Sequence, residues 1–152
     1  MKTRLLTGLA IGCLLLGTAG LVAEDDAKKD LEALNGTWKY ESVTFGGQKL
    51  PADALKKAAF VFKDGKYTSI NPEGKEEETG TVKVDPSKKP KTIEFDITSG
   101  KDKGKKQLGI YTLEGDNFTL CMGMPGEDQR PTKLESAKGS KTVLAVMKRE
   151  KK

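Results

Sequence analysis

Few residues in this sequence are suited to catalysis. The chain of 152 residues contains no histidine, which removes Ser-His-Asp and Cys-His catalysis and any histidine-based zinc site. Glu94 and Asp96 lie on one face of an alternating segment and form the best carboxylate pair for acid-base chemistry, yet the alternation predicts that this face meets solvent. We therefore expect no enzymatic activity, no metal site and no cofactor.

A thiol is the next candidate. Cys121 lies on the face opposite Phe118 and Leu120, where it could be a reactive or ligand-facing group. No histidine and no clear basic neighbour is available to activate it, so a packed cysteine is the preferred interpretation. Cys13 lies in the N-terminal apolar run, and removal of that run would leave no intrachain disulfide.

Arg130 is the ionisable residue best suited to holding a ligand. It lies beside a proline in the connection 124–132, where its planar donor fork could fold towards the mouth of the structure and bind a carboxylate or phosphate. An internal ion pair with Glu127 or Asp128 is the alternative.

Tyrosine hydroxyl groups could line a ligand cavity inside the fold. In small barrels, however, tyrosines more often complete the core and keep only their polar end wet, and both interpretations stay open. The candidate ligand-binding residues are therefore Arg130, Tyr111, Tyr40 and Cys121.

These side chains must be positioned by strands, because turn signals divide the chain at short intervals after residue 34. Asp64-Gly65 suits the tight turn of a hairpin. One helix is predicted at 51–57, after the first strand, where a proline can occupy the first turn. Eight strands are predicted, at 37–44, 58–63, 66–70, 76–84, 91–97, 107–113, 117–122 and 142–148.

Eight consecutive strands favour an all-β, antiparallel up-and-down barrel. Closure removes the exposed sheet edges and leaves an interior that is either packed or able to hold one small ligand. A two-sheet sandwich is the alternative, since strand counting does not separate the two folds. Room for a ligand would come from small residues at inward positions, namely Ser42, Ser69, Gly80, Gly109 and Ala145.

The first 23 residues have the pattern of a signal peptide. Lys2 and Arg4 precede an apolar run that ends at Ala23, and acidic residues follow at once. We expect cleavage after Ala23, with Ala19 as a second site, and export to the periplasm or the outside. An uncleaved leader would be the one source of membrane contact.

Residues 24–33 read as a flexible or helical lead-in, and residues 34–152 as one domain. The formal net charge is +5, but the basic runs at 88–91 and 101–106 are interrupted by Pro or Gly and lack aromatic residues for stacking on bases. Nucleic acid is therefore not an expected partner, and we expect a monomer.

At Gly36-Thr37-Trp38, the first strand opens with residues that resemble the lipocalin G-x-W signature, and Arg149 resembles its arginine partner. The resemblance implies that the arginine packs across the tryptophan and closes one barrel end, a cation-π contact worth about 0.5 to 2 kcal/mol.

A longer series of residues is similar to the uncharacterised lipocalin-like domain that recurs in planctomycete bacteria. It covers roughly residues 34–151 and implies a lipocalin-like fold without an established reaction or ligand. The residues of this chain that carry the similarity are Leu34 to Trp38, Gly46-Gly47, Lys89-Pro90-Lys91, Gly109-Ile110-Tyr111, Gly115-Asp116, Leu120-Cys121 and Arg130-Pro131-Thr132.

The leading functional hypothesis is an exported, non-enzymatic module that binds a small, partly apolar, amphiphilic ligand in the barrel. The ligand would enter at the end opposite Trp38, with Arg130 at the rim and Tyr111 nearby. The alternative is a cell-envelope interaction or structural module whose interior is packed and holds no ligand.

Overall fold

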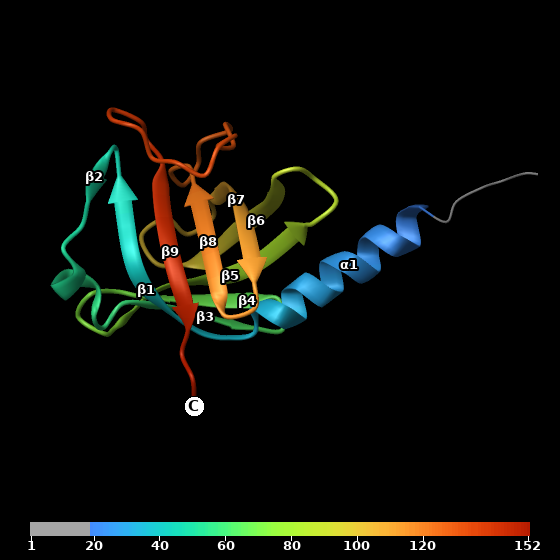
Figure 1. Cartoon of the computed structure of the whole chain (residues 1–152), viewed down its shortest axis with the longest axis horizontal. Coiled ribbons are helices and arrows are strands. Elements are labelled where there is room, and N and C mark those ends of the chain that lie inside the picture. Colours follow the sequence, from blue (N-terminus) through green and yellow to red (C-terminus); the bar gives the residue numbers. More distant parts are fainter. Residues whose placement is uncertain (1–18) are drawn as a thin grey trace, which may run out of the picture.

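Alternation of inward apolar and outward polar residues builds a closed barrel of eight antiparallel strands (Figure 1). The computed structural model describes residues 19–152, with side chains from residue 23 on, so most of the predicted leader lies outside the described residues. The barrel strands are β1 (Gly36–Phe45), β3 (Ala59–Lys63), β4 (Lys66–Ile70), β5 (Glu76–Asp85), β6 (Lys91–Ser99), β7 (Lys106–Glu114), β8 (Asn117–Met122) and β9 (Val143–Arg149).

The barrel closes between its first and last strands. Strand β3 pairs with β1, and each strand from β4 to β9 pairs with the strand that precedes it in the sequence. Strand β9 also pairs with β1, from Arg149 opposite Trp38 to Val143 opposite Phe45. The two-residue strand β2 (Gln48–Lys49) pairs only with the end of β1. The predicted up-and-down antiparallel barrel is confirmed.

Helical structure flanks the first strand on both sides. The short helix expected after it is the 3-10 helix η1 (Ala52–Leu55), which buries one side chain, Leu55. A longer helix, α1 (Ala19–Leu34), precedes it, so the lead-in 24–33 is helical and the predicted cleavage site after Ala23 falls within the helix. Among the described helices, none is long and apolar enough to cross a membrane.

Aromatic rings fill the interior. Neighbouring ring centroids lie between 4.9 Å, for Tyr67 and Phe95, and 6.4 Å, for Phe62 and Phe95. These separations are typical of tilted and edge-on aromatic packing. The cluster runs from the closed end towards the middle of the barrel through Trp38, Phe118, Phe62, Phe60, Phe95 and Tyr67.

Two of the positions expected to leave room inside are already filled. A Cβ at Gly80 would lie 2.7 Å from Cε1 of Tyr67 and 2.1 Å from a main-chain oxygen. A Cβ at Gly109 would lie 3.1 Å from Cγ of Met122 and 3.2 Å from Cγ2 of Ile93. These glycines let large neighbours approach the backbone, so they allow close packing and do not mark a gap.

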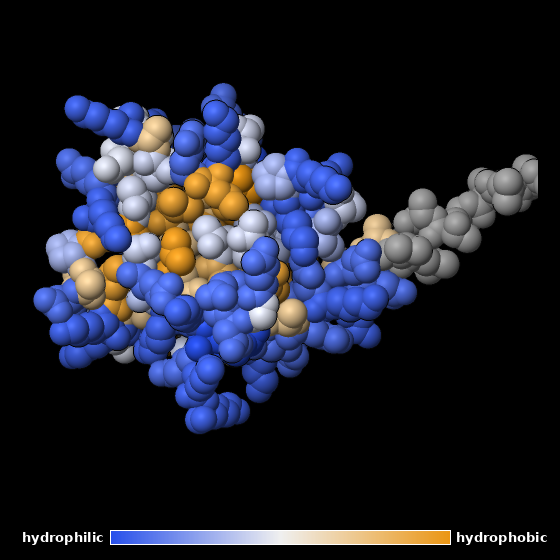
Figure 2. Space-filling model, in the orientation of Figure 1, coloured by the Kyte–Doolittle hydropathy of each residue, from blue (hydrophilic) through white to orange (hydrophobic). Residues whose placement is uncertain are grey.

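A second apolar layer lies on the outer face of the barrel. Strand pairing places Ile110 beside Cys121 and Cys121 beside Leu144, all facing outwards. Ile110 is 1% exposed and Cys121 is fully buried, because the long connection 123–142 folds over this face. Figure 2 shows apolar side chains gathered over the upper parts of β8 and β9, next to this connection.

Candidate functional site

The closed end of the barrel is built around Trp38 and Arg149. The guanidinium carbon of Arg149 lies 4.3 Å from the ring centroid of Trp38, so the predicted stacking is present. Gly36 has φ of 129° and a Cβ there would lie 3.0 Å from Nη1 of Arg149, which explains why this position suits glycine. The indole Nε1 donates to the carbonyl oxygen of Leu34 at 2.7 Å.

Arg149 also caps helix α1. Its Nη2 donates to the carbonyl of Ala33 at 2.5 Å, its Nη1 donates to the carbonyl of Asn35, and its Nε donates to Asp116 at 3.1 Å. The last carbonyls of a helix lack partners within the helix and carry partial negative charge, so a cation here is favourable. One side chain thus joins the first strand, the last strand and the helix.

Tyr111 belongs to this closed end as well. Its ring is fully buried and its hydroxyl donates to Oδ2 of Asp30 on α1 at 2.6 Å, while Lys91 reaches the same oxygen at 2.9 Å. Burial, followed by the bond to Asp30, raises the pKa of the Tyr111 hydroxyl above its ordinary range. The structure therefore places Tyr111 against the helix, in contrast to the expected place near a ligand-holding rim.

Tyr40 and Cys121 are also packed. The ring of Tyr40 lies 6.0 Å from that of Phe60, and burial, then Glu77 and Glu78, raises its pKa. The Sγ of Cys121 lies 3.4 Å from the carbonyl oxygen of Glu135 in the covering connection, and burial raises the pKa of the thiol. A thiol held protonated and covered is a poor nucleophile, as the packed-cysteine interpretation requires.

Arg130 lies on the outer face over β6 and β7. Its Nη1 donates to the carbonyl oxygens of Ile93 and Gly109, each at 2.6 Å, and its Nη2 lies 3.9 Å from Oε2 of Glu94. The predicted ion pair with Glu127 or Asp128 is wrong in its partner, because the guanidinium folds back onto the strands where carbonyls and Glu94 are available. Arg130 thereby fixes the connection 123–142 to the barrel.

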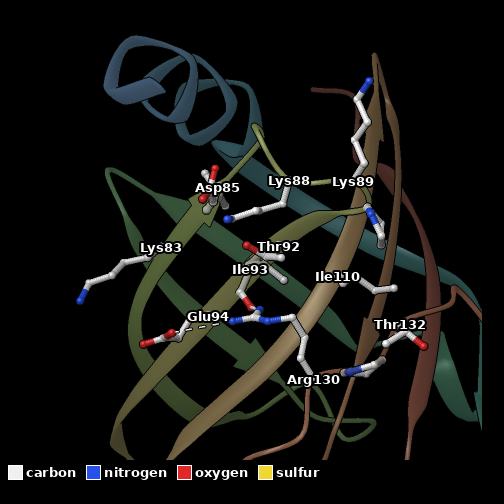
Figure 3. A pocket seen from close by; sticks show the side chains of 13 residues that line it. Lys83, Asp85, Lys88, Lys89, Thr92, Ile93, Glu94, Ile110, Arg130 and Thr132 are labelled. Atoms are coloured by element: carbon white, nitrogen blue, oxygen red, sulfur yellow. Dashed lines mark hydrogen bonds and ion pairs between the residues drawn. The ribbon is translucent and has the colours of Figure 1, made fainter. Parts of the chain in front are cut away.

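An open hollow of about 740 Å³ lies beside Arg130 (Figure 3). Its lining comes from the ends of β5 and β6, the connection between them, the middle of β7 and the segment 130–132. The residues are Lys83, Val84, Asp85, Lys88, Lys89, Pro90, Thr92, Ile93, Glu94, Ile110, Arg130, Pro131 and Thr132. Tyr111 lines a different hollow, on the other side of the Lys88–Pro90 segment.

The side chains of the hollow point in different directions. Figure 3 shows Lys88 extending over the hollow towards Asp85, whereas Lys83 and Lys89 point away from it. The guanidinium of Arg130 lies between Ile93 and Glu94. Lys88 and Arg130 are therefore the cations that face the space.

The carboxylates of this face already have partners. Glu94 accepts from Nζ of Lys106 at 2.5 Å, and the same Nζ lies 3.1 Å from Asp96. Asp85 accepts from the backbone N–H of Ser87 at 3.0 Å and from its hydroxyl at 2.5 Å. The carboxylate pair singled out for acid-base chemistry, Glu94 and Asp96, thus shares a lysine on the outer face.

The fold and these contacts define an antiparallel barrel with a filled interior, a capped closed end and a concave outer face. Within residues 23–152, no group of three or more potential metal-ligating side chains is arranged to hold a metal ion. Comparison with family models, with curated proteins and with solved structures finds no match to this chain. The resemblance to the planctomycete lipocalin-like domain stays a prediction.

Sequence reasoning missed Asp30 and Lys88. Asp30 lies in a charged, alanine-rich stretch and joins Tyr111 across 81 residues of chain, so no local pattern marks it. Lys88 belongs to the interrupted basic run 88–91, for which the sequence predicts no specific role. The nearby prolines, Pro86 and Pro90, were a usable signal, because they restrict the loop that carries it.

Proposed function

We propose that this protein is an exported, non-enzymatic binding module whose barrel is a packed scaffold and whose outer surface makes the functional contacts. The observation that carries the proposal is the filled interior, in which aromatic rings occupy the space and a Cβ at Gly80 or Gly109 would collide with neighbours. A ligand inside would have to displace these rings, at a cost of several kcal/mol in lost packing.

The chemistry of the polar groups supports binding in preference to catalysis. Cys121 is covered and burial raises the pKa of its thiol, and the pair of Glu94 and Asp96 is engaged by Lys106. The tyrosine hydroxyls of Tyr67 and Tyr111 donate to carboxylates, to Glu78 at 2.8 Å and Asp30 at 2.6 Å. Each of these five groups thus has a structural partner among the described residues.

The competing proposal is a ligand held inside the barrel. Methyl-labelled protein titrated with N-phenyl-1-naphthylamine, a neutral apolar probe, separates the two. We expect the interior signals of Ala145, Met147 and Leu120 to stay in place, because these side chains are buried among the rings. Saturable shifts of these interior methyls would contradict the packed scaffold and favour a ligand inside.

A cavity-creating variant provides the matched control. Phe95→Ala removes a ring that contacts Phe60, Phe62 and Tyr67. We expect this variant to lose stability and to take up the neutral probe inside, which shows that the assay detects interior binding when space exists. Native mass spectrometry of protein isolated from its own host then reports whether a molecule is carried at all.

A further inference from the structure

We propose that the hollow beside Arg130 binds a small monoanionic molecule with a flat apolar body. The proposal rests on the proposed function, because a packed interior leaves the outer face as the place for binding. The volume of about 740 Å³ is suited to such a molecule, since small-molecule sites commonly enclose about 300 to 1,000 Å³.

The floor and walls of the hollow offer apolar contact. Ile110 points outwards from β7 and is 1% exposed, and Pro90 and Pro131 line the hollow with it. Because Ile110 itself is covered, the apolar surface that a ligand ring could cover here comes mainly from Pro90 and Pro131. Burial of that surface is favourable by about 25 cal/mol per Å².

The polar groups of the hollow have hydrogen-bond donors left over. Oδ1 of Asp85 accepts both bonds from Ser87, and Oε1 of Glu94 accepts from Lys106, so one oxygen of each carboxylate is engaged. Among the described side chains, no carboxylate lies within 4.0 Å of the ammonium of Lys88, and Nη2 of Arg130 has one carboxylate contact, at 3.9 Å. A ligand that accepts hydrogen bonds and carries negative charge matches these donors.

Asp85 limits the charge that the hollow accepts. Figure 3 shows Lys88 directed towards Asp85, so an anionic group bound by Lys88 would lie near a carboxylate. Repulsion between like charges grows with each added charge on the ligand. The site is therefore suited to a single negative charge on an otherwise apolar molecule, such as an aromatic sulfonate or carboxylate.

Two fluorescent probes with the same ring system test the proposal. 8-Anilinonaphthalene-1-sulfonate is anionic, and N-phenyl-1-naphthylamine is its neutral counterpart. We expect the purified protein to bind the sulfonate at least tenfold more tightly than the amine. Lys88→Ala should weaken sulfonate binding about tenfold, as expected for a charge-assisted hydrogen bond at a partly exposed site, and change binding of the amine less than twofold.

The neighbouring lysine is the matched control. Lys89→Ala removes the same charge one residue away, but its side chain points away from the hollow, so it should change sulfonate binding less than twofold. Asp85→Asn keeps an oxygen for Ser87 and removes the repulsive charge, so sulfonate binding should strengthen by about threefold. Equal losses in the two lysine variants would overturn the proposal, because they would indicate only general attraction to a basic surface.

Amide and methyl shifts of the wild-type protein separate failure of this site from failure of the proposed function. Sulfonate-induced shifts centred on Thr92, Ile110 and Thr132 support the hollow. Shifts confined to another part of the outer face, or no binding, overturn the hollow and leave the packed scaffold intact. Shifts centred on the interior methyls of Leu120 and Ala145 overturn both.

Discussion

Arg149 at the closed end and Arg130 on the outer face each donate to two main-chain carbonyls, but they leave their surroundings in different states. Arg149 also binds Asp116 and stacks on Trp38, so its donors and one face of its guanidinium are engaged. Beside Arg130, the ammonium of Lys88 has no carboxylate within 4.0 Å among the described residues. Engaged donors stabilise a fold, whereas donors left over are available to a ligand.

The two regions also differ in what surrounds the arginine. At the closed end, Trp38 and Leu34 are fully buried, and a helix and two strands meet. On the outer face, Ile110 and Cys121 are buried under the connection 123–142, which contains no described helix or strand. We therefore expect changes at the closed end to lower the global stability and changes on the outer face to act locally.

Removal of the central ring of the closed end should have the largest effect. Trp38→Ala deletes a fully buried indole that contacts Phe118 and Arg149, and should lower the free energy of unfolding by about 3 to 5 kcal/mol. Chemical denaturation measures this loss. Trp38→Phe, which keeps an aromatic ring, should lose less, and a loss below about 1 kcal/mol in the alanine variant would contradict the role assigned to this ring.

Removal of the Arg149 side chain, which caps helix α1, should have the second-largest effect on stability. Arg149→Ala should cost about 2 to 3 kcal/mol, because it deletes the stacked cation and leaves the carbonyls of Ala33 and Asn35 without their donor. Lys148→Ala is the control, since Lys148 forms an exposed pair with Glu41 at 3.0 Å and should cost less than about 1 kcal/mol. Similar losses in both variants would show that Arg149 acts only as a surface charge.

The equivalent change on the outer face should be smaller and local. Arg130→Ala removes the clamp on the connection 123–142 and should cost about 1 to 2 kcal/mol. The reaction of Cys121 with a thiol reagent should accelerate at least tenfold, because the connection that covers it opens more often. Lys133→Ala, in the same connection, is the control and should leave the reaction rate unchanged. An unchanged rate in Arg130→Ala would contradict the role of Arg130 in holding the connection on the barrel.

The smallest effect concerns the hydroxyl of Tyr111. Tyr111→Phe loses the bond to Asp30 and should be less stable at pH 7 by about 1 kcal/mol. The pKa of Tyr111 is raised in the fold, so above pH 10 the unfolded tyrosine loses its proton before the folded one does. Stability of the wild type then falls with pH, by at most about 1.4 kcal/mol per pH unit for one proton, and the gap to the variant should narrow. A gap that widens between pH 9.5 and 11 would contradict this linkage.

The barrel could be predicted from the sequence because each strand has one face towards the core and one towards solvent. The alternation of Ile93, Phe95 and Ile97 with polar residues, and the Asp64-Gly65 turn, predict strands whose bounds lie within a residue or two of those observed. Trp38 and Arg149 were also found, because a resemblance to a motif connected them. Local patterns therefore predict the fold, and the motif predicts the contacts at the closed end of the barrel.

The candidate site was harder to predict, because its contacts are between distant segments. Nothing local to Arg130 indicates that its carbonyl partners lie 37 and 21 residues away, on β6 and β7. The strand pattern assigned Cys121 to the outer face, as observed, but a pattern of period two does not reveal that a connection covers that face. Burial imposed by loops depends on tertiary contacts that composition and alternation do not encode.

The contacts of Arg149, which join the first and last strands at the closed end, have a consequence for how the protein folds. Nη1 of Arg149 and the carbonyl of Asn35 are separated by 114 residues, so the contact requires closure of a very long loop. Contacts of such high sequence separation slow folding, and until β9 is in place β1 and β8 keep unpaired edges that are prone to intermolecular pairing. The barrel edges are therefore open to intermolecular pairing during synthesis until β9 (Val143–Arg149) has emerged, and the docking of β9 is the event that ends this exposure.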